Sequence, residues 1–332
     1  MARLAGLSTT AASMILTGRP DTRLSADAHA KVHAAAASLG YRPNVAARSL
    51  RTDKSRSIAF ISDYVATTRF ASGLIRGALA AAEEAKHVML VLETGGEPAR
   101  EIEAVEAALD RQVDGLIFAA MRAREVFVPD IAISIPVVML NGTSARFPVS
   151  VLPDEYEGGR EAVRLLAEAG NTEDVVLLGH NAEEEAGLFR SESISRRFAG
   201  IRDEMAARGL AFIAELSCWN WEPDQGYELT RALLKRQKPG AILCLNDRLA
   251  FGAYQALAEA GLAIPDDVAL VSFDNDELAS YLRPGLTTIA LPHEAMGRAA
   301  VQRLLDPQAT TGTMLPMPTV LRGSIRRAGI AG

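Results

Sequence analysis

Short apolar runs alternate with amphipathic stretches along most of the chain after residue 57. The apolar runs predict strands at 58–62, 88–93, 115–119, 137–140, 175–179, 212–217, 241–245, 268–272 and 286–291. The amphipathic stretches predict helices at 70–86, 98–111, 157–169, 195–208, 225–236, 248–260 and 293–305. Such alternation is typical of parallel sheets covered by helices on both faces. Because the pattern occurs in two sets, we expect two similar α/β lobes, with a ligand cleft between them at the carboxyl ends of the strands.

The first 40 residues show a different pattern, that of short helices joined by tight turns. The end of a first helix is predicted just before Gly6. A second helix is predicted from its N-cap, Ser8, to about residue 16, with its buried face formed by Ala12, Ile15 and Leu16. A third is predicted between the N-cap Ser25 and Gly40, with its buried face formed by Val32, Ala35, Ala36 and Leu39.

Three short helices with a tight turn between the first two are the plan of a helix-turn-helix, whose second helix enters the major groove of DNA. The polar side of that helix supplies the candidate DNA contacts Ser8, Thr9, Thr10, Ser13 and Met14. Uncharged residues on this face are equally typical of a small helical cap that packs on the body. Spacing alone therefore leaves both interpretations open.

The segment from Tyr41 to Arg51 predicts a helix of about two turns that begins at Pro43. A helix this short is not stable alone in water, so we expect it to form only against a partner. Leu50 lies between Arg48 and Arg51, a pattern suited to a minor-groove wedge whose arginines hold phosphates. The candidate DNA contacts of this segment are Tyr41, Asn44, Arg48, Leu50 and Arg51, and a polar linker follows at 52–57.

The net charge of −6 is unevenly divided along the chain. Residues 1–57 hold nine basic and three acidic side chains, whereas the remaining 275 residues hold 26 basic and 38 acidic ones. A basic head on an acidic body indicates that the head meets a polyanion, although a basic stretch is also typical of a solvated surface.

Composition and motifs exclude several classes of protein. The two cysteines, Cys218 and Cys244, rule out a disulfide scaffold and a four-ligand zinc site. The chain contains neither G-x-G-x-x-G, a Gly-Lys-Ser/Thr phosphate loop nor G-x-S-x-G, and His293-Glu294 lacks the second histidine of a zincin. The acidic run 183–185 is interpreted as a solvated loop. We therefore expect no enzyme, no metal and no cofactor. Since no signal peptide or membrane span is recognisable, we expect a cytoplasmic protein.

The order helix-turn-helix, Gly40-Tyr41-Arg42-Pro43-Asn44, Ala47, Leu50 resembles the LacI/GalR family of bacterial transcription regulators. The body resembles it as well, so the resemblance covers essentially the whole chain. Its landmarks are Leu74-Ile75-Arg76-Gly77, Val113-Asp114-Gly115, Asn246-Asp247, Ser272-Phe273-Asp274, Pro284-Gly285-Leu286-Thr287-Thr288 and Arg322-Gly323-Ser324.

The resemblance implies a helix-turn-helix head at 1–40, a hinge helix and linker at 41–57, and a two-lobed body at 58–332 like that of periplasmic binding proteins. Lobe 1 is expected at about 58–153 and 288–307, and lobe 2 at about 154–287 and 308–328. It further implies a homodimeric repressor that binds a pseudo-palindromic operator and a small-molecule effector. Two departures concern the head. Met14 stands where a long polar residue is common, and members usually carry a short segment before the position of Met1.

Carried over residue by residue, the resemblance places the effector against Phe70, Asn141, Arg197, Trp221, Asn246 and Asp274. Aromatic faces and fixed polar groups of this kind suit a sugar or sugar derivative. Each position also has a structural alternative: a core aromatic, a surface cation, or a turn residue that caps the next helix. Arg69 and Arg190, near the expected cleft, would favour an anionic ligand.

A rival class is the solute-binding protein of a transport system, which shares the two-lobed fold. That class needs a signal peptide and has no basic helical head.

Overall fold

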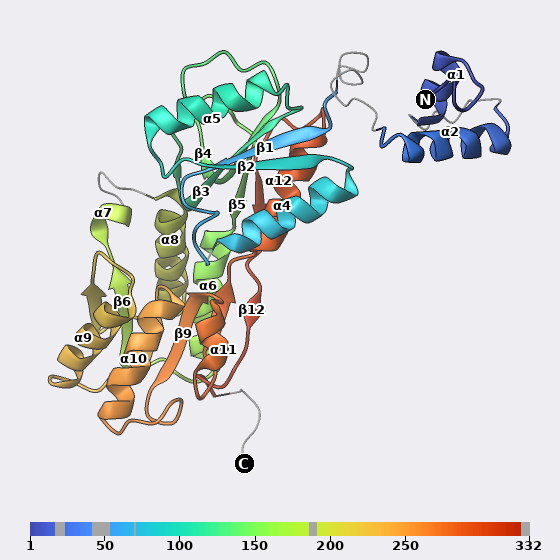
Figure 1. Ribbon diagram of the computed structural model, residues 1–332. Coiled ribbons are helices and arrows are strands. Elements are labelled where there is room, and N and C mark those ends of the chain that lie inside the picture. Colours follow the sequence, from blue (N-terminus) through green and yellow to red (C-terminus); the bar gives the residue numbers. More distant parts are fainter. Residues whose placement is uncertain (17–23, 42–53, 70, 186–190, 327–332) are drawn as a thin grey trace. The chain divides into compact units, whose positions relative to one another are not determined.

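The computed structural model describes residues 1–16, 24–41, 54–69, 71–185 and 191–326 (Figure 1). The chain forms two compact units. The first comprises Met1–Arg56 together with Gln112–Asp114, and the second comprises Ser57–Arg111 and the chain from Gly115 onward.

The first unit contains helices α1 (Thr9–Leu16) and α2 (Ala26–Ser38). Both predicted N-caps are confirmed: Ser8 Oγ accepts a hydrogen bond from Ala11 N (3.1 Å), and Ser25 Oγ accepts one from Ala28 N (3.2 Å). Before Gly6 the chain makes a single turn, in which Ala5 N donates to Met1 O (3.1 Å). The core of this unit is formed by Ala5, Ala12, Ile15, Ala28, Val32 and Ala35.

The inward position predicted for Leu39 is wrong, because this side chain is 55% exposed. Helix α2 ends at Ser38, and Leu39 is its C-cap residue with φ −95° and ψ 0°. The chain therefore leaves the helical path before Leu39 can follow the buried face of α2.

The second unit contains two six-stranded sheets, and this confirms the predicted α/β class. The first sheet has the order β11 (Thr313–Leu315), β5 (Ser150–Pro153), β4 (Val137–Thr143), β3 (Leu116–Glu125), β1 (Ser57–Ser62) and β2 (Val88–Glu93). All its pairs are parallel. The second has the order β12 (Thr319–Val320), β10 (Thr287–Ala290), β9 (Ala269–Asp274), β8 (Ala241–Cys244), β6 (Val175–His180) and β7 (Ala214–Ser217). Only the β10–β12 pair of this sheet is antiparallel.

The helices that pack on the first sheet are α4 (Ser72–Glu84), α5 (Pro98–Asp110) and α12 (His293–Leu305). Helices α4 and α12 pack against each other (Figure 1). Their buried side chains also pack against the strand residues Phe60, Ile117 and Leu140. These strand residues come from three neighbouring parallel strands. The core of this half is therefore built where the α4–α12 pair covers one face of the sheet.

The second sheet is covered on both faces, as its near-continuous apolar strands require. Helices α6 (Glu155–Glu168) and α8 (Glu192–Ala207) pack on the face that carries Leu243. Helix α10 (Asp247–Glu259), which pairs with α9 (Pro223–Leu234), packs on the face that carries Ile242. Successive residues of β8 thus pack into the cores on opposite faces of the sheet, because side chains alternate between the two faces of a strand. Two short helices, α7 (Ala182–Glu185) and α11 (Glu277–Tyr281), complete the second unit.

Glycines bring the backbones of α6 and α8 unusually close. A Cβ atom on Gly200 would lie 1.9 Å from Tyr156 O, and one on Gly159 would lie 2.3 Å from Arg197 O. Real Cβ atoms do not approach backbone atoms this closely, so only glycine fits at these two contacts. The close approach places the start of α6 directly against the middle of α8.

Several expectations differ from the structure. The acidic run 183–185 lies in helix α7 and not in a loop. Strands β5, β11 and β12 were not predicted; β11 and β12, with three and two residues, are too short to show a period. The lobe boundaries also differ: β10 joins the second sheet by pairing with β9, and β11 joins the first by pairing with β5. No helix in the described ranges is both long and apolar enough to cross a membrane.

Candidate functional site

Four of the six predicted effector residues form one cluster at the carboxyl ends of the second sheet. Arg197 lies on α8, Asn246 follows β8, and Asp274 is the last residue of β9. The Arg197 guanidinium carbon lies 4.2 Å from the centre of the Phe273 ring and 6.0 Å from that of Trp221. This is the end of the sheet at which ligands bind in open α/β folds.

Arg197 is a buried cation and not the surface residue that its alternative interpretation proposed. Its Nε and Nη2 donate to the two carboxylate oxygens of Glu155 (2.6 and 2.8 Å), and its Nη1 donates to Leu245 O (2.6 Å). Burial by itself lowers the pKa of Arg197, and the Glu155 carboxylate outweighs this effect, so the pKa is raised. The guanidinium is therefore permanently charged and is neutralised from within the protein.

Asp274 is held in a conformation that L-residues rarely adopt, with φ +102°. Its side chain is 11% exposed and makes no hydrogen bond among the described residues; Arg197 Nη2 lies 3.9 Å from its Oδ1. Burial raises the pKa of Asp274 well above its usual range, and Arg197 opposes this effect. A positive φ at a residue other than glycine is typical of functional positions.

Asn246 and Trp221 make the contacts that their structural alternatives predict. Asn246 Oδ1 accepts from Leu249 N (2.8 Å) as the N-cap of α10, and its Nδ2 donates to Trp221 O (3.1 Å). Trp221 Nε1 donates to Gly179 O (2.9 Å), and the ring packs against both cores of the second sheet. Both residues shape the wall of the cluster.

On the first sheet, Asn141 is buried near the end of β4, with φ +52°. Its Nδ2 donates to the carbonyl oxygens of Ala120 (2.9 Å) and Met121 (3.1 Å). Its amide group therefore ties β4 to β3. The remaining predicted effector residue, Phe70, lies outside the described residues, as does Arg190.

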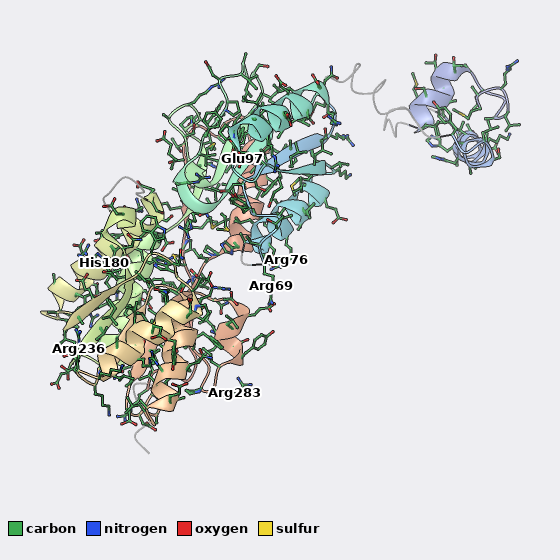
Figure 2. All side chains as sticks on the ribbon, turned by 60° about the vertical axis from the view of Figure 1, so that its left-hand side comes forward. Arg69, Arg76, Glu97, His180, Arg236 and Arg283 are labelled. Atoms are coloured by element: carbon green, nitrogen blue, oxygen red, sulfur yellow. The ribbon has the colours of Figure 1, made fainter. Side chains whose placement is uncertain are left out.

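A cavity of about 630 Å³ opens beside Asp274, a volume within the usual range of small-molecule sites. It is lined by Arg69, Ser72, Gly73, Arg76, Asp274–Glu277, Ala290–Ala295 and Pro318. Figure 2 shows Arg69 and Arg76 on the side of the first-sheet elements that faces the second sheet. The cavity thus lies between the elements of the two sheets.

The arginines of the cavity are paired with carboxylates. Arg69 donates to Glu277, and Arg76 Nε donates to Glu294 (2.8 Å). Among the described residues, the lining holds two arginines and the four carboxylates Asp274, Asp276, Glu277 and Glu294. The cavity wall therefore carries more acceptors than cations.

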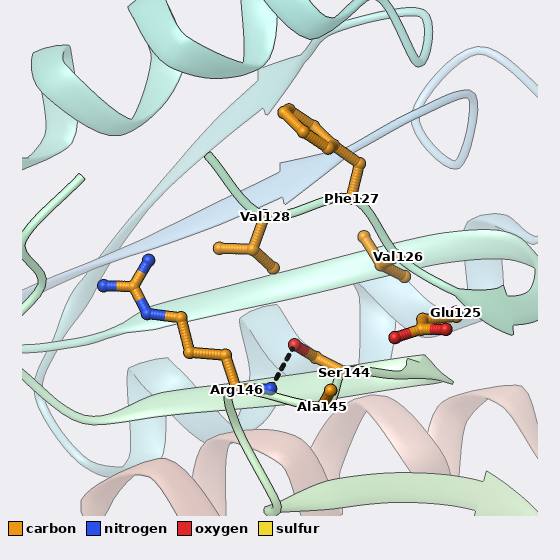
Figure 3. A pocket seen from close by; sticks show the side chains of 7 residues that line it. All are labelled: Glu125, Val126, Phe127, Val128, Ser144, Ala145 and Arg146. Carbon is orange, nitrogen blue, oxygen red and sulfur yellow. Dashed lines mark hydrogen bonds between the residues drawn. The ribbon is translucent and has the colours of Figure 1, made fainter. Parts of the chain in front are cut away.

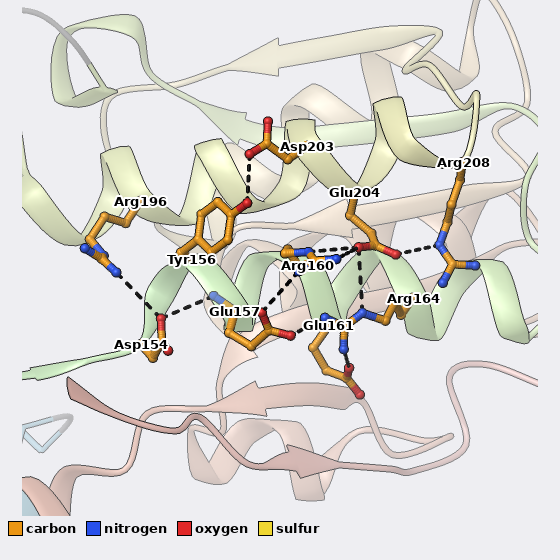
Figure 4. Close-up of polar contacts among 10 residues, drawn as sticks. All are labelled: Asp154, Tyr156, Glu157, Arg160, Glu161, Arg164, Arg196, Asp203, Glu204 and Arg208. Atoms are coloured by element: carbon orange, nitrogen blue, oxygen red, sulfur yellow. Dashed lines mark hydrogen bonds and ion pairs between the residues drawn. The ribbon is translucent and has the colours of Figure 1, made fainter.

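Polar contacts beyond Arg197 hold α6 and α8 together (Figure 4). Glu204 accepts from Arg208 (2.8 Å) and from Arg160 (3.0 Å), and these bonds lower the pKa of Glu204. Tyr156 Oη donates to Asp203 (2.9 Å), the residue next to Glu204 on α8. The two helices form a rigid pair that positions Glu155 opposite Arg197.

A second cavity, of about 390 Å³, lies between the segments Glu125–Val128 and Ser144–Arg146 of the first-sheet half (Figure 3). Ser144 Oγ accepts from Arg146 N (3.2 Å). The Arg146 guanidinium donates to Pro129 O (3.0 Å) and Ile131 O (2.5 Å), so it stabilises the adjacent loop. None of the predicted site residues that the structure describes lines this cavity.

The sequence analysis did not single out as site residues three buried carboxylates that closely follow strands: Asp63 after β1, Glu155 after β5 and Asp247 after β8. Glu155 is the partner of Arg197 described above. Asp247 accepts from Ser272 Oγ and Asp276 N (2.7 Å), and burial raises the pKa of Asp247 to about 6. Asp63 accepts from Met121 N (2.9 Å) and Arg124 Nη2 (3.2 Å). The position of Asp63 directly after an apolar strand was a usable signal for a residue at the carboxyl edge of a sheet.

In the first unit, helix α1 presents its polar side to solvent. Ser8, Thr9, Thr10 and Ser13 are exposed, and Met14 is half-buried. Tyr41 is also exposed. The other predicted DNA contacts, Asn44, Arg48, Leu50 and Arg51, lie outside the described residues.

Comparison with known proteins gives consistent matches over the whole chain. The periplasmic binding protein-like domain family matches residues 163–325. The Ribose operon repressor of Escherichia coli (strain K12) is 30% identical over 313 residues, which cover 92% of this chain and 91% of that protein. The HTH-type transcriptional repressor PurR of Vibrio parahaemolyticus is 30% identical over 317 residues, covering 92% of this chain and 90% of that protein. The crystal structure of the Lac repressor dimer bound to operator and the anti-inducer ONPF superimposes with a TM-score of 0.79 at 26% identity and covers 98% of each chain.

A helical head joined to a two-sheet body with a cleft between the sheets defines a ligand-binding transcription regulator. The chain belongs to the LacI/GalR family of bacterial transcription regulators. Its relatives are repressors and not enzymes, and the alternative of a transport solute-binding protein is not favoured.

Proposed function

We propose that the protein is a homodimeric repressor that acts in the cytoplasm, binds a pseudo-palindromic operator, and changes its operator affinity when a sugar or sugar derivative occupies the 630 Å³ cavity. The proposal divides the chain into a head (1–40), a hinge helix and linker (41–57) and an effector-binding body (58–332). One observation supports the proposal: the same chain contains a capped helix with an exposed polar face and a cleft lined by Asp274, which is partly buried and has a positive φ.

DNA contact is assigned to two parts of the chain. In the head, Ser8, Thr9, Thr10, Ser13 and Met14 lie on or beside the face of α1 that is not packed against the core of the first unit. Small hydroxyl side chains and an apolar methionine suit base edges and thymine methyl groups. In the hinge, Tyr41, Asn44, Arg48, Leu50 and Arg51 are assigned to phosphates and to a wedged minor-groove step.

The charges of the cleft support an uncharged ligand rich in hydroxyl groups. Arg69, which alone would favour an anion, is neutralised by Glu277, and Arg197 is neutralised by Glu155. Among the described lining residues, the carboxyl groups that remain are those of Asp274 and Asp276. A phosphate or carboxylate ligand would find the described arginines of the lining already paired with carboxylates, whereas sugar hydroxyl groups would hydrogen-bond to the remaining carboxyl groups.

The edge of the first sheet supports a dimer. Strand β2 is the edge strand, its sequence is almost wholly apolar, and Val88 is 64% exposed. Exposed apolar edge strands are avoided in monomeric proteins because they promote association. A second copy of the chain is the partner that we assign to this surface.

The proposal is tested with the full-length protein and a fluorescent DNA taken from the region upstream of its own gene. Ribose and a panel of related neutral sugars, each with its phosphorylated counterpart, are added to the protein–DNA complex. We expect one neutral sugar to change the apparent Kd, and its phosphorylated form to act more weakly. Preference for the phosphorylated form would contradict the charge argument, and failure to distinguish this DNA from random DNA would contradict the assignment as a repressor.

A further inference from the structure

A single carboxylate, that of Asp114, holds Ser55 and Arg56 near the end of the linker. Asp114 Oδ1 accepts hydrogen bonds from Ser55 N (2.8 Å) and Ser55 Oγ (3.0 Å), and Asp114 Oδ2 accepts one from Arg56 N (2.9 Å). Asp114 lies in the short loop between α5 and β3, far from these residues in sequence. Both carboxylate oxygens are thus bound to consecutive backbone N–H groups, an arrangement that we call the Asp114 clamp.

The backbone at the clamp adopts a conformation that the isolated chain disfavours. Arg56 has φ +55°, in the left-handed region that non-glycine residues seldom occupy. Successive N–H groups around such a residue form a concave anion-binding nest. Here the anion is supplied by the protein itself, so the Asp114 carboxylate stabilises the strained linker end in one geometry.

The clamp continues directly into the first sheet. Arg56 precedes β1 and Asp114 precedes Gly115 at the start of β3, and these two strands pair in parallel with Ala59 opposite Leu116. Ala59 N donates to Gly115 O (3.0 Å), immediately beyond the clamp. The clamp therefore lies at the amino ends of the strands, opposite the carboxyl ends where Asp63 and the ligand cleft lie.

We propose that Asp114 is a positioning residue for DNA binding, an inference that rests on the proposed function. By fixing Ser55 and Arg56 to the loop before β3, it sets the direction in which the linker leaves the body. A movement of the first sheet caused by a ligand is then transmitted to the linker. Without the clamp, the linker end is free to move independently of the first sheet. The ligand-bound and ligand-free positions of the sheet then have the same free energy for the linker, and the movement is not transmitted.

The clamp is tested first without DNA, by trypsin cleavage of the full-length protein after Lys54 and after Arg56. Asp114→Ala removes all three acceptor contacts, and we expect cleavage at these two bonds to accelerate about tenfold or more. Asp114→Asn should give an intermediate rate, because the amide keeps one acceptor oxygen and turns an NH₂ group toward a backbone N–H. The control Asp110→Asn, at the exposed end of α5, should cleave like the wild type.

The same four proteins are then assayed on the DNA upstream of the gene and on random DNA. We expect Asp114→Ala to lose about tenfold in affinity for the upstream DNA, less for random DNA, and to keep the circular dichroism of the wild type. Unchanged cleavage would overturn the clamp. Faster cleavage with unchanged DNA preference would overturn the positioning role and leave Asp114 as a structural cap. A wild type without DNA preference would overturn the proposed function and the positioning role together, whereas the cleavage pattern would still report the clamp.

Discussion

Arg197 and Glu155 form a bidentate ion pair, with N–O distances of 2.6 and 2.8 Å, in which each side chain is only 3% exposed. The pair joins α8 to the first turn of α6 at the point where glycines bring the two helices together. Removal of either partner would leave a buried charge without its counter-ion. Arg197→Ala is therefore expected to lower stability as well as any response to a ligand, and it is a poor variant for testing the cleft.

Glu155→Gln should lower the free energy of unfolding by about 3–5 kcal/mol, the usual consequence of breaking a buried ion pair from one side. Equilibrium unfolding in guanidinium chloride measures this change. The control is Glu168→Gln, at the exposed end of the same helix, which should lie within about 0.5 kcal/mol of the wild type. Equal stability of the two variants would show that the pair contributes nothing.

Asp274→Asn is the sharper test of the cleft. Asparagine tolerates the positive φ of this position, and its amide has the same size as the carboxyl group, so the fold should be retained. We expect affinity for an active sugar to fall about tenfold or more, because the amide keeps only one acceptor oxygen and places an NH₂ group where the carboxyl group had its second oxygen, while DNA affinity is unchanged. Calorimetric titration and DNA anisotropy measure the two effects. Loss of DNA binding by this variant, or an undiminished sugar affinity, would show that Asp274 does not contact the ligand.

The pKa of Asp247 predicts a defined pH dependence. Burial raises it to about 6, whereas the unfolded chain has a value of about 3.9, so the folded state binds this proton more tightly. Wild-type stability should therefore fall relative to Asp247→Asn as pH rises from about 4 to 6, by up to about 3 kcal/mol, and the difference should then stay constant. Unfolding titrations across this range measure the slope. The exposed control Asp224→Asn should follow the wild type throughout.

The periodic parts of the fold could be predicted from the sequence because their signals are local. The run 88–93 predicted β2 to the residue, and the helix at 293–305 was predicted with the bounds of α12. Strands as short as β11 carry no period, and their place depends on a partner far along the chain. The exposure of Leu39 could not be predicted either, because it depends on the residue at which α2 ends, and the apolar pattern does not fix that residue.

The candidate site was only partly predictable for a related reason. Arg197, Trp221, Asn246 and Asp274 were found through family landmarks, and they do lie together. Glu155 was missed because nothing in its local sequence distinguishes it from the exposed glutamates of α6. Its burial arises from Arg197, 42 positions away, and from the glycine contacts that bring α6 and α8 together.

Leu50→Ala should weaken binding to the operator much more than binding to random DNA. Insertion of a side chain between base pairs is favourable only where the base step deforms easily. Its removal therefore weakens binding to the specific site most. The melting temperature should be almost unchanged, since the hinge helix is expected to form only on DNA. Parallel titrations on the two DNAs measure the ratio of affinities. Equal losses of affinity for the two DNAs would show that Leu50 only packs against neighbouring residues and does not enter a base step.

The central claim is that residues 1–57 bind DNA through phosphate contacts, and a salt titration of DNA affinity tests it most directly. If the dimer makes six to ten such contacts, the affinity of the full-length protein should fall ~10³–10⁵-fold between 50 and 200 mM salt. A protein that lacks residues 1–57 should keep the folded second unit and lose operator binding at every salt concentration. Operator binding by that truncated protein, or an affinity of the full-length protein that does not change with salt, would contradict the account.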